Sequence, residues 1–331
     1  MDKIIEALQG KTLLITGATG LIGRNLIQFL NSVNENFEKP VKILALVRDI
    51  EKAKRQFKNI NNIEYVIGNV INKIVVDSEI DYIIHAASQT SSKMFVNEPV
   101  QTIETAFQGT KNVLELGKEK DVKSIVYLST MEVYGAPITD EKIDESHDTN
   151  INTMTVRSSY PESKRMCETL CCAYYSEYGL PVKVVRLTQT FGQGVPYNDS
   201  RVFAEFARCA IEKRDIVLHT KGETKRNYLD VLDAVEAILV VLLKGENGQA
   251  YNAANEDTYC SILEMAKMVA EKCAENKINV LIKIEDEKKF GYAPTLKMNL
   301  DTSKLRKLGW EPKRGLESMF SLMIEDMQGN R

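Results

Sequence analysis

A tyrosine and a lysine with the spacing of a catalytic pair stand in SSYPESK, residues 158–164. Pro161 suits the first turn of a helix, where its missing N–H costs nothing, so Tyr160 and Lys164 are predicted to share one helix face. A phenol with a pKa of about 10 is a poor base at neutral pH. A neighbouring ammonium stabilises the phenolate and lowers that pKa. Tyr160 could then remove a hydroxyl proton while hydride passes from the same carbon to a nicotinamide.

A second candidate group lies upstream in VYLSTMEVYG, residues 126–135. The apolar run before it predicts a buried parallel strand that ends at Thr130. Ligands of such sheets bind at the carboxyl ends of the strands, so we expect Thr130 beside Tyr160, sharing a hydrogen bond with the reacting oxygen. Glu132 could move a proton at the carbon next to a ketone that the oxidation forms transiently. The alternative is a structural glutamate that only accepts hydrogen bonds.

A glycine-rich turn near the N-terminus has the spacing of a dinucleotide-binding loop. In LLITGATGLIGRNL, residues 13–26, Gly17, Gly20 and Gly23 stand between a predicted strand and a predicted helix. The first glycine permits a sharp turn, the second lets N–H groups approach a pyrophosphate, and the third permits close helix–sheet packing. The stretch lacks the Lys-Ser/Thr pair of a nucleoside-triphosphate loop, so we predict a dinucleotide.

Elements that would position these residues follow from the alternation of apolar runs and amphipathic stretches. The runs TLLIT, KILALV, YIIHAA and SIVYLS are apolar almost throughout, which is typical of parallel strands covered on both faces. We predict an α/β fold, a Rossmann-type doubly wound parallel sheet with a smaller C-terminal α/β substrate lobe. Residues 1–188 would form the NAD(P)-binding domain, with the chain re-entering it near 228–252. Residues 189–331 would form mainly the substrate-binding lobe.

Composition excludes several classes of partner. The 331 residues carry 43 basic and 46 acidic side chains, a net charge of −3, which indicates neither a nucleic-acid nor a polybasic membrane surface. The N-terminus is not that of a signal peptide, and the most apolar later stretch, VEAILVVLL, is far shorter than the ~20 residues of a membrane span. We therefore expect a cytoplasmic protein with reduced thiols. Cys167 and Cys171 lie one turn apart with no histidine nearby in sequence, so we expect core residues and no metal site.

Together, the glycine turn, Thr130 and Tyr160-x-x-x-Lys164 resemble the extended short-chain dehydrogenases and reductases, the NAD-dependent nucleotide-sugar epimerases and dehydratases. The resemblance runs from about residue 11 to beyond residue 310. It implies an enzyme that binds a nucleotide-diphosphate sugar and forms a homodimer through helices at about 100–120 and 161–178. The LGWEP stretch, residues 308–312, resembles a C-terminal marker of the family that we expect to be structural.

The resemblance also implies a set of site residues. The implied catalytic residues are Thr130, Tyr160, Lys164 and Glu132. The implied cofactor-binding residues are Gly17, Thr19, Gly20, Leu21, Ile22, Gly23, Arg48, Asn69, Val70, His85, Ala86, Ala87, Tyr160 and Lys164. The implied substrate-binding residues are Ser88, Thr130, Met131, Glu132, Gln189 and Arg226. Among the last, Arg226 would contact the diphosphate or ribose, and Gln189 replaces an asparagine of many relatives.

The choice between NAD and NADP depends on the end of the second strand. A carboxylate there would hold the ribose 2′-hydroxyl, whereas an arginine accepts a 2′-phosphate. Val47 stands at the usual acidic position and Arg48 follows it, which favours NADP. Asp49 could still reach a ribose, and Arg48 could be an ordinary solvated charge.

Departures from the family pattern bear on the reaction. The dehydratases carry Thr-Asp-Glu where this chain has Thr130, Met131 and Glu132, and a methionine cannot donate a proton. The sugar-acid decarboxylases carry Thr-Ser-Glu, which is closer. They also place an arginine two residues before a late proline, and if that proline is Pro294 the position holds Tyr292.

The leading interpretation is 4-epimerisation through transient oxidation at C4. The alternatives are a net NADP-dependent reductase or dehydrogenase, and a dehydratase or decarboxylase that uses Glu132. A cofactor-bound protein without catalysis is disfavoured, because Thr130, Tyr160 and Lys164 are all present.

Overall fold

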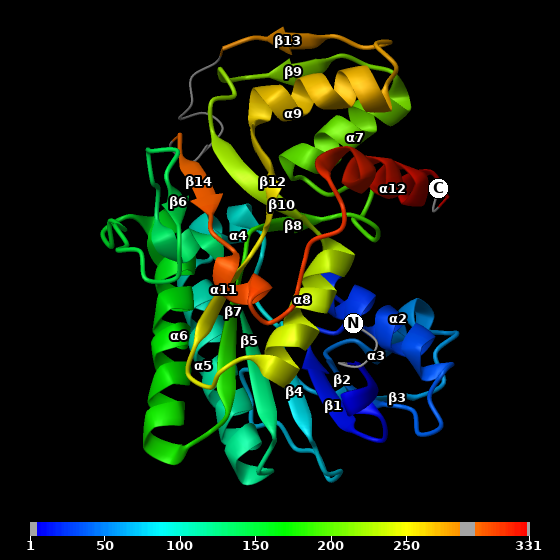
Figure 1. Cartoon of the computed structure of the whole chain (residues 1–331), viewed down its shortest axis with the longest axis vertical. Helices are drawn as coiled ribbons and strands as arrows, with labels where there is room; N and C mark the ends of the chain where they lie inside the picture. The colour runs from blue at the N-terminus through cyan, green and yellow to red at the C-terminus, as the bar shows by residue number, and fades with distance from the viewer. Residues whose placement is uncertain (1–4, 285–294, 330–331) are drawn as a thin grey trace.

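A parallel sheet forms the centre of the computed structural model, which describes residues 5–284 and 295–329 (Figure 1). Within these residues the sheet has seven strands in the order β11-β7-β5-β4-β1-β2-β3, and every neighbouring pair is parallel. Its strands are β1 (Thr12–Thr16), β2 (Lys42–Val47), β3 (Ile63–Ile67), β4 (Tyr82–His85), β5 (Ser124–Thr130), β7 (Val182–Leu187) and β11 (Ala250–Ala253). The predicted doubly wound α/β sheet is confirmed.

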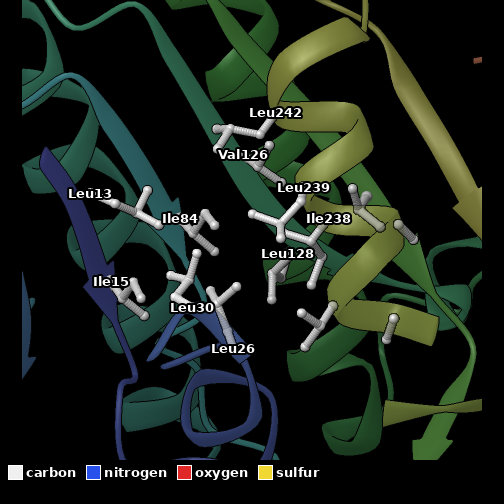
Figure 2. Close-up of a cluster of buried hydrophobic side chains, with 14 of the residues drawn as sticks. Leu13, Ile15, Leu26, Leu30, Ile84, Val126, Leu128, Ile238, Leu239 and Leu242 are labelled. Carbon is white, nitrogen blue, oxygen red and sulfur yellow. The ribbon is translucent and has the colours of Figure 1, made fainter. Parts of the chain in front are cut away.

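Helices cover both faces of this sheet, as Figure 1 shows. One face carries α2 (Leu21–Asn34) and α8 (Val231–Lys244), and the other carries α5 (Pro99–Glu119) and α6 (Ser159–Tyr178). Side chains of β1 alternate between them: Leu13 and Ile15 pack toward the first pair, and Leu14 packs toward the second. Two covered faces explain why the strand is apolar at successive positions. Figure 2 shows the first core, where leucines of α2 and α8 approach those of β1 and β5.

The chain leaves the central sheet after β7, builds a smaller lobe, and returns to the sheet at β11. A second sheet contains β12 (Asn255–Ser261), β10 (Lys225–Asp230), β14 (Lys297–Leu300), β6 (Lys142–Ile143) and β8 (Gln189–Phe191), and beside it β9 (Ile216–Leu218) pairs with β13 (Val280–Ile282). The helices of this lobe, at the top of Figure 1, are α7 (Val202–Glu212), α9 (Ile262–Met268) and α12 (Leu316–Gly329). They pack around Phe191, Phe203 and Phe320. The division of the chain into two domains stays a prediction.

Short elements connect the larger ones. They are η1 (Glu6–Leu8), α3 (Ile50–Gln56), α4 (Ser92–Asn97), η2 (Met131–Tyr134), η3 (Val156–Ser158), η4 (Val269–Cys273) and α11 (Ser303–Arg306). Three of them, α4, η2 and η3, contact α6 near its N-terminal end and so surround the predicted catalytic tyrosine.

The LGWEP stretch ties the C-terminal segment to α8. Trp310 is fully buried, and its indole N–H donates to the Asp233 carbonyl over 3.1 Å. The Asp233 carboxylate accepts the backbone N–H groups of Lys313 and Arg314, each at 2.9 Å, and the Arg314 guanidinium at 2.6 Å. The stretch therefore serves the fold.

No helix in the described part of the chain is both long and apolar enough to cross a membrane. Cys167 and Cys171 are buried in the core between α6 and the sheet. Across residues 5–284 and 295–329, no group of three or more histidine, cysteine or acidic side chains could hold a metal ion.

Candidate active site

The glycine turn lies at the point where the direction of strand order reverses. From β1 the chain continues to β2 and β3 on one side, and then crosses to β4 on the other. In open α/β sheets, ligands bind outside the carboxyl ends of the strands at such a point. Gly17 leaves β1 with φ +67°, and a Cβ there would lie 2.7 Å from the Ala86 carbonyl. A Cβ on Gly23 would collide with the Gly17 carbonyl oxygen. The tight passage between β1, β4 and α2 therefore requires glycine at both positions.

The first turn of α2 fits the phosphates of a dinucleotide. Its N-cap is Gly20, which brings no side-chain hydrogen bond to the helix terminus, so the first N–H groups are available to an anion. Thr19 beside it is half-buried. Leu21 packs toward the core of the smaller lobe, and Ile22 packs toward the core on the α2 and α8 face. The turn is thus fixed by apolar contacts on both sides.

His85 at the end of β4 is held entirely by the protein. Its Nδ1 lies 2.7 Å from the Thr16 hydroxyl, and its Nε2 lies 3.2 Å from the Thr110 hydroxyl. Burial, and to a smaller extent the charge of Lys164, lowers the pKa of His85 to about 3. The imidazole therefore links β1, β4 and α5. Because both ring nitrogens are occupied, a cofactor would contact the backbone at this position. The same applies to Ala86 and Ala87, which follow and are half-buried.

The ends of β2 and β3 carry the other expected cofactor residues. Arg48 is exposed, and the neighbouring Asp49 carboxylate caps α3 by accepting the Lys52 N–H over 2.9 Å. Asn69 is half-buried, and its side-chain oxygen accepts the backbone N–H two residues later over 3.3 Å. Val70 packs against α5, where a Cβ on Gly109 would lie 2.9 Å from it. Val70 thus contributes mainly packing.

Thr130, Tyr160 and Lys164 come together at the junction of β5 and α6. Thr130 is the last residue of β5, and its hydroxyl is hydrogen-bonded to the Tyr160 phenol. Lys164, one helical turn after the tyrosine, is buried and donates to the Leu128 carbonyl over 2.7 Å. Its Nζ lies 5.9 Å from the centre of the Tyr160 ring. The three side chains that were expected to act together therefore lie close to one another in the fold.

The electrostatics of Tyr160 differ from the expectation. Burial raises the pKa of the phenol, and the Glu132 carboxylate raises it further. The Thr130 hydrogen bond and the Arg157 charge lower the pKa but do not offset burial. Burial also lowers the pKa of Lys164 to about 8, so this cation is itself weakened. In the protein without cofactor, Lys164 is not among the groups that lower the pKa of Tyr160, although its position one turn away predicted that it would be.

Two residues that the sequence reasoning missed lie against this group. Arg157 pairs with Glu132 over 2.8 Å, and both side chains are about one-third exposed (35% and 33%). Phe95 of α4 stacks on Tyr160, with ring centres 4.1 Å apart and an angle of 9° between the planes. The Arg157 guanidinium carbon lies 4.9 Å from the centre of the Phe95 ring. An arginine three residues before the tyrosine was visible in the sequence, whereas nothing there indicated the Phe95 contact.

Met131, one of the expected substrate contacts, lies mostly in a small core, and its contact with substrate stays a prediction. Its side chain is 6% exposed and packs with Val133, Tyr134 and Met298, while its sulfur accepts a hydrogen bond from Thr188 over 3.3 Å. It therefore contributes to a core, since a long apolar side chain is excluded from water at this strand end. Ser88 is half-buried and donates to the neighbouring Gln89 carbonyl over 3.2 Å.

Gln189 and Arg226 are brought together from distant parts of the sequence. The strands β8 and β10 pair in parallel, and the Arg226 guanidinium donates to the Gln189 side-chain oxygen over 3.0 Å. Arg226 Nε is buried without a partner in the described residues, as is the Tyr228 hydroxyl two residues later. Such unpaired donors suit a polar ligand. Tyr292 and Pro294, at the position where the sugar-acid decarboxylases carry an arginine before a proline, lie outside the described residues.

Comparison with known proteins gives a family match and a fold match. The model of the NAD dependent epimerase/dehydratase family matches residues 13–254. UDP-glucuronic acid decarboxylase 4 of Arabidopsis thaliana is 31% identical over 330 residues, which cover 98% of this chain and 71% of that protein.

Two solved structures share the fold. An epimerase from Methanothermobacter thermautotrophicus has a TM-score of 0.84 at 24% identity, over 99% of this chain and 95% of that one. The NAD complex of dTDP-glucose 4,6-dehydratase from Bacillus anthracis has a TM-score of 0.79 at 22% identity, over 97% of each chain.

Proposed function

Because this chain belongs to the NAD-dependent epimerase/dehydratase family and is therefore an enzyme, we propose that it acts on a nucleoside-diphosphate sugar by transient oxidation at C4. The observation that carries the proposal is the meeting of Thr130, Tyr160 and Lys164 at the end of β5. Thr130 ends a strand of the sheet whose first strand leads into the glycine turn, at the edge where α/β enzymes bind ligands. The Gln189–Arg226 pair is the proposed contact for the diphosphate.

Different residues of the chain would carry out different parts of the oxidation. The turn at Gly17 and the N-terminus of α2 would hold a nicotinamide dinucleotide, which when bound supplies the hydride acceptor. Tyr160 takes the proton of the 4-hydroxyl, and Thr130 shares a hydrogen bond with the same oxygen. The Lys164 ammonium donates a hydrogen bond to the Leu128 carbonyl, and it lies 5.9 Å from the centre of the Tyr160 ring.

The leading outcome is 4-epimerisation, in which hydrogen returns to the opposite face of C4. This outcome needs no further acid or base, so Glu132 would then position the sugar. The cofactor would be regenerated in each turnover and could stay bound. We propose NADP in preference to NAD on the basis of Arg48, which stands exposed at the end of β2.

Decarboxylation is a second candidate, favoured by the Glu132–Arg157 pair beside Tyr160. Oxidation at C4 of a hexuronic acid would create a ketone next to the carbon that bears the carboxylate, and such β-keto acids lose CO₂. Glu132 could then return a proton to C5. The name of the Arabidopsis thaliana relative supports this candidate.

The first experiment separates these outcomes. Purified protein is denatured and any released dinucleotide is identified by mass spectrometry. The native protein is then incubated with UDP-glucose, UDP-N-acetylglucosamine or UDP-glucuronic acid, and products are followed by NMR and CO₂ release. Inversion at C4 without CO₂ supports the epimerase, and CO₂ release supports the decarboxylase.

Other results would revise the proposal. Released NAD would count against the assignment of NADP to Arg48. Stoichiometric consumption of added NADPH would indicate a net reductase, and loss of water would indicate a dehydratase. No change in any sugar nucleotide would contradict the proposed function.

A further inference from the structure

Arg157 lies between the acidic side chain of the site and the aromatic ring beneath the proposed base. Its guanidinium donates to Glu132 over 2.8 Å. The same guanidinium rests 4.9 Å from the centre of the Phe95 ring, and Phe95 stacks on Tyr160 at 4.1 Å. Two contacts of different kinds thus fix the position of one cation close to Tyr160.

The element that carries Phe95 is itself anchored. The Ser159 hydroxyl donates to the Phe95 carbonyl over 2.9 Å, which joins α4 to the first residue of α6. Phe95 is 2% exposed, so its ring has little freedom to move away. The arginine, the ring and the tyrosine therefore form a stack whose geometry is set by backbone contacts.

We propose that Arg157 is a positioning residue, which holds the Glu132 carboxylate in an ion pair so that its negative charge opposes ionisation of Tyr160 less strongly. The inference rests on the proposed function, because it takes Tyr160 to be the base. It applies equally to epimerisation and to decarboxylation, since both begin with the loss of the 4-hydroxyl proton.

The charges around the phenol support this role. Glu132 on η2 raises the pKa of Tyr160, while Arg157 on η3 lowers it. From β5 comes the Thr130 hydrogen bond, which lowers the pKa, and from α6 comes the Lys164 ammonium, 5.9 Å from the ring. The helix α4 contributes the uncharged Phe95 ring. Without Arg157, the Glu132 carboxylate would act on the half-buried phenol with its charge uncompensated.

The test is a direct titration of residue 160. A fluorinated tyrosine, more acidic than tyrosine, is placed at position 160 of the full chain, and its ionisation is followed by ¹⁹F NMR. Arg157→Met should move the midpoint upward by about one pH unit, and Arg157→Lys should restore most of the shift. The double variant Arg157→Met with Glu132→Gln should return the midpoint to the wild-type value or below it.

A matched control is available on α6, the helix that carries Tyr160. Arg165 pairs with Glu162 over 3.1 Å at 40% and 32% exposure, close to the values of the Arg157 pair, but this pair is not among the charges that act on Tyr160. Arg165→Met should leave the midpoint unchanged. An unchanged midpoint in Arg157→Met, or a double variant that stays shifted, would overturn the inference.

If Arg157→Met does not fold, the single variant Glu132→Gln still tests the inference. Glu132→Gln should lower the midpoint, and an unchanged value would again overturn the inference. Failure of the proposed function has a different signature. Turnover retained in Tyr160→Phe would remove the tyrosine as base, whatever the ¹⁹F titrations gave.

Discussion

At the scale of single residues, burial opposes the chemistry proposed for Tyr160. Desolvation by burial raises the pKa of the phenol, and the nearest cation in the sequence pattern, Lys164, donates to a backbone carbonyl. Ionisation in the working enzyme therefore depends on charges brought close to the phenol. Arg157 supplies one from the protein, and the bound cofactor would supply another.

Replacement of the phenol tests its role as base. Tyr160→Phe should lower kcat by roughly 10²- to 10⁴-fold, because it removes only the proton acceptor. Dinucleotide binding, measured by calorimetry, should persist because the ring still stacks on Phe95. Tyr175→Phe is the control, since Tyr175 is 40% exposed on the same helix. Full turnover in Tyr160→Phe would contradict the assignment.

His85 predicts how stability depends on pH. Its pKa is lowered from 6.5 to about 3 in the folded protein, so the unfolded chain binds more protons between these values. Stability should therefore fall as the pH falls through this window, by up to about 1.4 kcal/mol per pH unit from this group.

Chemical denaturation across the acid range measures this dependence. His85→Gln should show a shallower acid loss than the wild type, whereas the exposed His147→Gln should follow the wild type. Equal slopes for His85→Gln and wild type would rule out His85 as a source of the acid dependence.

At the scale of elements, a largely buried ion pair joins α6 to the sheet. Arg186 of β7 forms two-pronged contacts with Glu168, at 2.7–3.2 Å, with side-chain exposures of 15% and 12%. The same guanidinium donates to the Tyr134 hydroxyl over 2.8 Å, and Ser129 donates to Glu168 over 2.5 Å. This network holds the helix that carries Tyr160 against the strand that ends in Thr130.

Breaking one side of this pair should be costly. Arg186→Met should lower the free energy of unfolding by about 3–5 kcal/mol, because Glu168 would keep a buried charge without its partner. Urea denaturation measures the change. The control is Lys73→Met, which breaks an exposed pair with Glu119 and should cost about 0–1 kcal/mol. Equal costs for the two variants would contradict a structural role for the network.

At the scale of the whole molecule, α5 presents an apolar face to solvent. Val100, Ile103 and Phe107 are 66%, 46% and 37% exposed and follow each other at the spacing of one helix face. Met166 on the neighbouring α6 is 54% exposed. The homodimer expected from the family resemblance would bury this face, with α5 and α6 of both copies in contact.

A charge on this face tests the dimer. Phe107→Glu should convert a dimer into a monomer in light scattering after size exclusion, because the carboxylate would be desolvated at the interface. Leu322→Glu on α12 is the control, since Leu322 is 38% exposed on a different surface. A wild-type monomer, or a dimer that tolerates Phe107→Glu, would contradict this interface.

The fold class and the central group of the candidate site could be predicted from local sequence patterns. Short apolar runs at successive positions are typical of strands covered on both faces, and Gly17 and Gly23 stand where a Cβ would meet backbone atoms. Tyr160 and Lys164 were predictable because their spacing is local to one helix.

The environment of that group, in contrast, depends on contacts that form when the chain folds. Phe95 reaches Tyr160 from α4, Met131 turns into a core, and the pKa of Tyr160 rises rather than falls. These outcomes depend on burial and on contacts between residues far apart in the chain. Desolvation acts only once the fold has excluded water, so local spacing could not foretell it.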